Sequence, residues 1–70
     1  DSPEEVLAER ISLAEILKRL NESDRQLICL RFYAGKTQSK TAQILGTTQV
    51  QISRRERKIL KWMRKELTGE

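Results

Sequence analysis

The sequence predicts an all-α domain of four helices that ends in a helix-turn-helix. The single proline is Pro3, and the glycines stand only at Gly35, Gly46 and Gly69, where helix ends are expected. No stretch alternates apolar and polar residues in the manner of a half-buried strand. Seventy residues allow one domain, residues 1–70. Because the chain opens on aspartate and not on methionine, we expect it to be a domain of a longer protein.

Capping residues predict the first two helices. Ser2-Pro3 has the form of an N-cap followed by a proline at the first helical position, so a first helix is expected to run from there to about Leu20. Asn21 is expected to cap a second helix, with Asp24 completing a capping box. Gly35 is expected to end that helix in the left-handed conformation.

The last two helices form the predicted helix-turn-helix, at about residues 37–57. Thr37 is expected to cap a short helix that ends near Leu45, Gly46 supplies the turn, and Thr48 caps a helix of nearly twenty residues. The inward side of this last helix is predicted to comprise Ile52, Ile59, Met63 and Leu67.

The composition argues against catalysis, metals and membranes. Histidine is absent, and the one cysteine, Cys29, lies between Ile28 and Leu30, where a buried core position in a reducing, cytoplasmic environment is expected. No zinc cluster, phosphate-binding glycine loop or activated nucleophile is present, so we predict no enzyme, no cofactor and no metal. No segment is apolar for long enough to cross a membrane.

Charge divides the chain into two halves and indicates a polyanionic partner. Residues 1–24 carry three basic and seven acidic side chains, a net charge of −4. Residues 25–70 carry eleven basic and three acidic side chains, a net charge of +8. A basic half of this kind is typical of a domain that neutralises nucleic-acid phosphates. The scarcity of aromatic residues disfavours a single-stranded ligand, which needs stacking platforms.

The spacing of Ala42, Gly46 and Ile52 is that of a helix-turn-helix, whose second helix enters the major groove of DNA. With Ile52 turned inward, the outer side chains at the start of that helix are expected to read bases: Gln49, Val50, Ser53 and Arg54. Helix N-termini and nearby cations are expected to bind phosphates through Thr37, Gln38, Thr48, Arg57 and Lys58.

Several of these segments together resemble region four of bacterial sigma factors, and most of all the sporulation and general-stress types F, B and G. The resemblance rests on Leu30-Arg31-Phe32-Tyr33, Gly35-Lys36-Thr37-Gln38-Ser39 and Leu45–Arg54, followed by Glu56 and Ile59-Leu60. It extends from about Leu20 to Leu67.

This resemblance implies a promoter-recognition domain that binds the upstream promoter element as double-stranded DNA. It also implies docking on the β-flap of RNA polymerase, through residues such as Leu17, Leu20 and Ile28, and an anti-sigma factor as a further partner. By position, it adds Arg31 to the phosphate contacts. The expected location is the cytoplasm, at the nucleoid.

Three positions depart from the family pattern, because Thr41, Thr47 and Arg55 stand where members usually have an aliphatic residue. Each threonine has nearly the shape of valine but carries a hydroxyl that needs a partner. Arg55 falls between Ile52 and Ile59 on the inward side, so it is expected to reach the rim, to pair with an acid or to extend the phosphate-binding surface. We predict that Arg55→Leu raises the melting temperature of the isolated domain, and an unchanged or lower value would show that Arg55 is already well accommodated.

Two other functions remain open at this point. The chain has the features of a stand-alone helix-turn-helix transcription regulator, although no coiled-coil seam for dimerisation is evident. The three polar departures also suit a sigma-like domain that acts mainly as a protein-interaction module.

Overall fold

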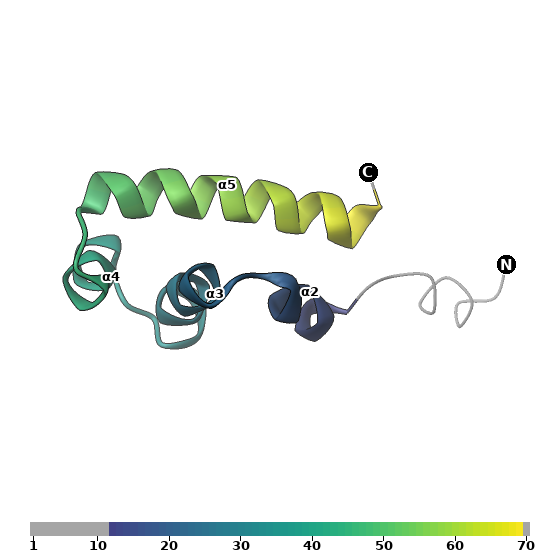
Figure 1. Cartoon of the computed structure of the whole chain (residues 1–70), viewed down its shortest axis with the longest axis horizontal. Coiled ribbons are helices and arrows are strands. Elements are labelled where there is room, and N and C mark those ends of the chain that lie inside the picture. Colours follow the sequence, from purple (N-terminus) through teal and green to yellow (C-terminus); the bar gives the residue numbers. More distant parts are fainter. Residues whose placement is uncertain (1–11, 70) are drawn as a thin grey trace, which may run out of the picture.

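The computed structural model describes residues 12–69, which form helices joined by short turns and contain no strand within that range. The helices are α2 (Leu13–Arg19), α3 (Glu22–Ile28), α4 (Gln38–Leu45) and α5 (Gln49–Thr68). A π-helical stretch, η1 (Cys29–Tyr33), continues α3. Helix α5 lies along one side of the domain, with α4 under its amino end and α2 toward its carboxyl end (Figure 1). The predicted all-α architecture with a carboxyl-terminal helix-turn-helix is confirmed.

Three of the predicted N-caps make the expected hydrogen bonds. The Thr37 hydroxyl accepts from the backbone N–H of Lys40 at 3.0 Å, and the Thr48 hydroxyl accepts from that of Gln51 at 3.2 Å. The Asn21 side chain accepts from the Asp24 backbone N–H at 2.8 Å. Each cap satisfies a helix N–H that has no partner inside its own helix, so local sequence alone determines where these helices begin.

The first helix differs from its prediction. The segment up to residue 11 lies outside the described residues, and Ser12 has an extended backbone with φ of −71° and ψ of 157°. The Ser12 hydroxyl accepts from the Glu15 N–H at 3.2 Å, so this serine is itself an N-cap. A single helix running across this position is therefore wrong, because Ser12 starts a separate helix, α2.

The second helix also differs, because its last turn widens. The backbone N–H of Ala34 donates to the Cys29 carbonyl five residues back, at 2.9 Å. That i→i−5 pattern defines a π-helix, which is common at functional sites. Gly35 follows with φ of 68°, as predicted for a left-handed terminator.

The core lies between α5 and the helices under it. Ile52 is fully buried, and Ile59 and Met63 continue its line along α5. Leu67 is 38% exposed, so its predicted inward position is wrong. The preceding residue, Glu66, meets Arg19 of α2, and a step of about 100° per residue turns Leu67 away from that contact. The other buried apolar residues are Ile16, Leu20, Leu27, Ile28 and Ala42.

Cys29 is half-buried, which corrects the expectation of a core position. It lies at the start of η1, beside an open depression that Leu30 and Ile44 also line. The expectation rested on residue type and on the apolar neighbours Ile28 and Leu30, which do not determine the direction in which the Cys29 side chain faces.

Candidate nucleic-acid interface

The turn between α4 and α5 is built as the spacing of Ala42, Gly46 and Ile52 predicts. Ala42 is 4% exposed and Ile52 is fully buried, so the two helices meet through one small and one branched side chain. Gly46 has φ of 72°, which glycine adopts without strain. The Thr47 N–H donates to the Ala42 carbonyl at 2.9 Å, and the Gly46 N–H to the Gln43 carbonyl at 3.3 Å. These two bonds form a Schellman motif that ends α4.

The four predicted base-reading residues all lie on the first turns of α5. Gln49 and Arg54 are exposed, Val50 is 58% exposed and Ser53 is half-buried. Val50 and Arg54 lie nearly opposite Ile52, which packs into the core, whereas Gln49 lies one turn before Ile52 on a neighbouring side of the helix. The amino end of α5 therefore presents polar and small apolar groups outward from a rigid base, as an element that reads base edges requires.

The residues predicted to bind phosphates surround that end of the helix. Thr37, Thr48, Arg57 and Lys58 are exposed, whereas Gln38 is half-buried. The hydroxyls of Thr37 and Thr48 cap α4 and α5, which leaves the first N–H groups of both helices near the surface. Helix N-termini of this kind bind phosphate oxygens.

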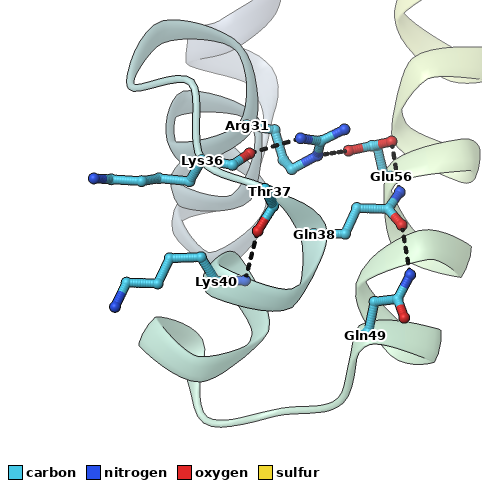
Figure 2. Close-up of polar contacts among 7 residues, drawn as sticks. All are labelled: Arg31, Lys36, Thr37, Gln38, Lys40, Gln49 and Glu56. Carbon is cyan, nitrogen blue, oxygen red and sulfur yellow. Dashed lines mark hydrogen bonds and ion pairs between the residues drawn. The ribbon is translucent and has the colours of Figure 1, made fainter.

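Arg31 takes part in contacts inside the domain. Its Nε donates to Glu56 Oε1, and its Nη1 donates to the Lys36 carbonyl at 2.6 Å. Glu56 Oε2 accepts from Gln38 Nε2 at 3.1 Å, and Gln38 Oε1 accepts from Gln49 Nε2 at 3.2 Å. Figure 2 shows these side chains as one continuous chain from η1 to the start of α5.

Glu56 was not among the predicted site residues, although it accepts hydrogen bonds from two of them, Arg31 and Gln38. A signal for it exists. Glu56 is the only acidic residue among the first seventeen positions of α5, and it lies two turns after Gln49. An isolated acid in a basic helix is expected to have a specific partner, because it otherwise weakens attraction to a polyanion.

The three departures from the family pattern have different surroundings. Arg55 Nη2 lies 3.0 Å from Asp24 Oδ1 and 2.6 Å from the Ser23 hydroxyl, so the expectation that it pairs with an acid is confirmed. Thr47 is half-buried. Thr41 is fully buried, and its hydroxyl has no hydrogen-bond partner among the described residues. Only Thr41 therefore carries an uncompensated polar group in the corner.

An apolar groove of about 140 Å³ lies on the domain, formed by α2, η1 and the second half of α5. Leu17 lines it, as the resemblance suggested for a polymerase-facing surface. Ile28 was expected there too, and it lines the groove as a buried residue of its floor. Leu20 was also expected there, but it is buried and does not line the groove. The exposed large apolar side chains of the groove are Leu13, Phe32, Tyr33 and Leu60.

Two searches of the described residues found nothing. Within residues 12–69, no three His, Cys, Asp or Glu side chains are grouped so that they would hold a metal ion. No helix in that part of the chain has both the length and the apolar character of a membrane span.

Comparison with known proteins agrees with this geometry. The family described as Sigma-70, region 4 matches residues 16–65. The chain is 43% identical over 67 residues to the RNA polymerase sigma-F factor of Bacillus licheniformis, which covers 96% of the chain and 26% of that protein. It is 40% identical over 67 residues to the sigma-F factor of Bacillus subtilis (strain 168), with the same coverage. The sigma-G factor of the latter organism is 37% identical over 59 residues, covering 84% of the chain and 23% of that protein.

The chain belongs to the sigma-70 region 4 family. It is similar to RNA polymerase sigma factors of the F, G and B types, which supports region four of an alternative sigma factor of these types. It spans about a quarter of the length of these relatives. No solved structure matches it significantly.

Proposed function

We propose that this chain is the promoter-recognition domain of an alternative sigma factor and that it binds the upstream promoter element in the major groove of double-stranded DNA. The observation that carries the proposal is the amino end of α5, where Gln49, Val50 and Arg54 are exposed directly over the buried Ile52. Family membership and the sigma-factor relatives support it. The domain acts by binding alone, without catalysis or a cofactor, in the cytoplasm at the nucleoid.

In this proposal the exposed residues have separate roles. Arg54 and Gln49 read base edges by hydrogen bonds, Val50 contacts a thymine methyl group, and Ser53 adds a further polar contact. Thr37, Gln38, Thr48, Arg57 and Lys58 hold phosphates, which positions α5 without selecting a sequence. Arg31 is bonded to Glu56 and to the Lys36 carbonyl, so it contributes to the phosphate surface chiefly by fixing the loop before α4.

The roles are tested by measuring binding to a set of duplexes in which each position of a selected site carries each base pair. Arg54→Ala is expected to lower discrimination at one position by about tenfold, because a bidentate contact to guanine is lost. Lys58→Ala is expected to weaken binding to every duplex about equally and to reduce the slope of log K against log salt by about one. If both variants only scale the affinity, the division of roles is wrong.

We further propose that the apolar groove docks on the β-flap of RNA polymerase. Exposed apolar side chains at Leu13, Phe32, Tyr33 and Leu60 support this, since a contiguous apolar surface usually marks an interaction site. Leu60→Ser is expected to abolish binding of a β-flap fragment in a pull-down while binding of duplex DNA is retained. Retained flap binding by this variant would contradict the assignment. An anti-sigma factor is a further proposed partner of the same domain.

A further inference from the structure

A series of hydrogen bonds connects Arg31 in η1 with Gln49 at the start of α5. The order of donors and acceptors along this series fixes which group of the Gln49 amide would face a base. Gln49 donates to Gln38, Gln38 donates to Glu56, and Glu56 accepts a second bond from Arg31. These residues come from three segments, η1, α4 and α5, so the series of hydrogen bonds forms only in the folded domain (Figure 2). The inference below rests on the proposed role of Gln49 in base reading.

Glu56 determines which way both glutamine amides point. An ionised carboxylate only accepts hydrogen bonds, so Gln38 must turn its NH₂ group toward Glu56. Its oxygen then faces Gln49, and Gln49 must turn its own NH₂ group toward Gln38. As a result, Gln49 Oε1 points away from Gln38, and among the described residues it has no hydrogen-bond partner (Figure 2).

The arrangement is anchored inside the domain. The Glu56 side chain is only 12% exposed and that of Arg31 is 23% exposed. The Arg31 guanidinium also lies over the Phe32 ring, 5.6 Å from its centroid, and bonds the Lys36 carbonyl. A carboxylate that is bonded on one side to a fixed arginine cannot rotate freely. The position of the Glu56 carboxylate therefore fixes the orientation of the Gln38 amide and, through it, that of the exposed Gln49 amide.

The orientation of Gln49 matches one purine better than the other. Gln49 offers an acceptor, Oε1, and the second N–H of its amide, which together complement the N6 donor and N7 acceptor of adenine. Guanine presents two acceptors, N7 and O6, so Oε1 would face another acceptor. We propose that Glu56, acting through Gln38, is a specificity-determining positioning residue that sets Gln49 to select adenine over guanine.

Glu56→Gln tests this inference, because it should exchange the donor and acceptor roles of the Gln38 and Gln49 amides. Arg31 Nε still donates, so it holds the oxygen of the introduced amide and turns the new NH₂ group toward Gln38. Gln38 then accepts from it and presents NH₂ to Gln49, and Gln49 accepts with Oε1 and presents its own NH₂ outward. The variant should therefore favour guanine where the wild-type chain favours adenine, a change of about tenfold or more in the ratio of the two affinities.

The experiment measures the 70-residue chain against paired duplexes that differ only by A·T or G·C at one position. That position is identified as the one where Gln49→Ala removes the preference of the wild-type chain. Glu66→Gln is the matched control, because it removes the same charge from the same helix at a residue that meets Arg19 instead of Gln38. Both variants should strengthen overall binding slightly, but only Glu56→Gln should change the ratio.

The outcomes separate this inference from the proposed function. A reversed ratio in Glu56→Gln supports the inference, and a ratio within twofold of wild type overturns it. If Gln49→Ala alters no preference at any position, base reading by Gln49 is itself wrong. If Glu56→Gln does not fold, Gln38→Ala is used, since it keeps the Arg31–Glu56 pair. Its ratio should fall to about one, and a wild-type ratio would overturn the inference.

Discussion

The two ends of α5 carry different kinds of surface, a polar one at the amino end and an apolar groove beside the second half of the helix. At the amino end, the candidate DNA-reading side chain of Gln49 is connected to α4 and η1 by hydrogen bonds through Gln38, Glu56 and Arg31. At the carboxyl end, the groove beside Leu60 consists of exposed apolar side chains, which hydrogen bonds do not orient. The first surface is in position before a ligand arrives. The second leaves apolar area in water that only a partner would cover.

Because the two surfaces are built differently, substitutions at the two ends of α5 should affect different properties, the stability of the fold at one end and partner binding at the other. A substitution beneath the amino-terminal surface should mainly lower the stability of the fold, because the side chains there, such as Ile52, are buried in the core. A change on the groove should act on partner binding and leave folding nearly unaffected. The four predictions below test that separation, from the largest expected effect on stability to the smallest.

Ile52→Ala should destabilise the domain by about 2–5 kcal/mol, because it opens a cavity under the helix-turn-helix at a fully buried position. Urea unfolding followed by circular dichroism measures the change. Val50→Ala, two residues away and 58% exposed, is the control and should change stability by less than about 0.5 kcal/mol. Similar losses in the two variants would show that the corner does not pack through Ile52.

Arg55→Leu should lower the free energy of unfolding by about 1 kcal/mol, since Asp24 and Ser23 lose a partly buried partner. The sequence alone predicted the opposite sign, a higher melting temperature, but the pairing of Arg55 with Asp24 and Ser23 removes the reason for that prediction. A double-mutant cycle with Asp24→Asn isolates the pair. A higher melting temperature in Arg55→Leu would mean that the pair does not compensate for burial.

Thr41→Val should raise the free energy of unfolding by about 1 kcal/mol, because it removes a buried hydroxyl that lacks a partner and keeps the shape of the side chain. The control is Thr47→Val, which should have a smaller effect because Thr47 is half-buried. Thermal and urea unfolding give the values. Destabilisation by Thr41→Val would indicate that the hydroxyl is satisfied in solution.

Phe32→Ser should lower the free energy of unfolding by about 1 kcal/mol or less, far below the effect of Ile52→Ala, since the ring is 52% exposed and its contact with the Arg31 guanidinium is partly solvated. Binding of the β-flap fragment should nevertheless be lost. Urea unfolding and a pull-down on the same preparation test both statements. A loss of stability comparable with that of Ile52→Ala would place Phe32 in the core and remove the contrast between the two surfaces.

Much of the fold followed from local sequence. The starts of α3, α4 and α5 were predicted because Asn21, Thr37 and Thr48 bond to N–H groups three residues on, which is a matter of local geometry. Ser12 uses the same chemistry, but it lies within a stretch of helix-forming residues and its capping role was missed. The π turn of η1 was missed because no residue type marks it.

The residues of the candidate site also fall into two groups, those that local sequence predicted and those that it did not. Helical spacing placed Gln49, Val50, Ser53 and Arg54 on the outside, since one buried position fixes the facing of the whole turn. Helical spacing could not predict the contact between Glu56 and Arg31, because these residues are 25 positions apart in sequence and lie on different helices. The resemblance to a known family also implied Leu20 on a docking surface, although the packing of α5 against α3 and α2 buries it away from the apolar groove.

The sequence by itself therefore determined the starts of α3, α4 and α5, the turn at Gly46 and the outward residues of α5, because caps, glycine conformation and helical period act over a few residues. Only the tertiary structure decided that Arg55 meets Asp24, that Thr41 lacks a partner and that Glu56 connects Arg31 with Gln38. These contacts depend on where separate helices come to lie, and that position results from the packing of the whole core.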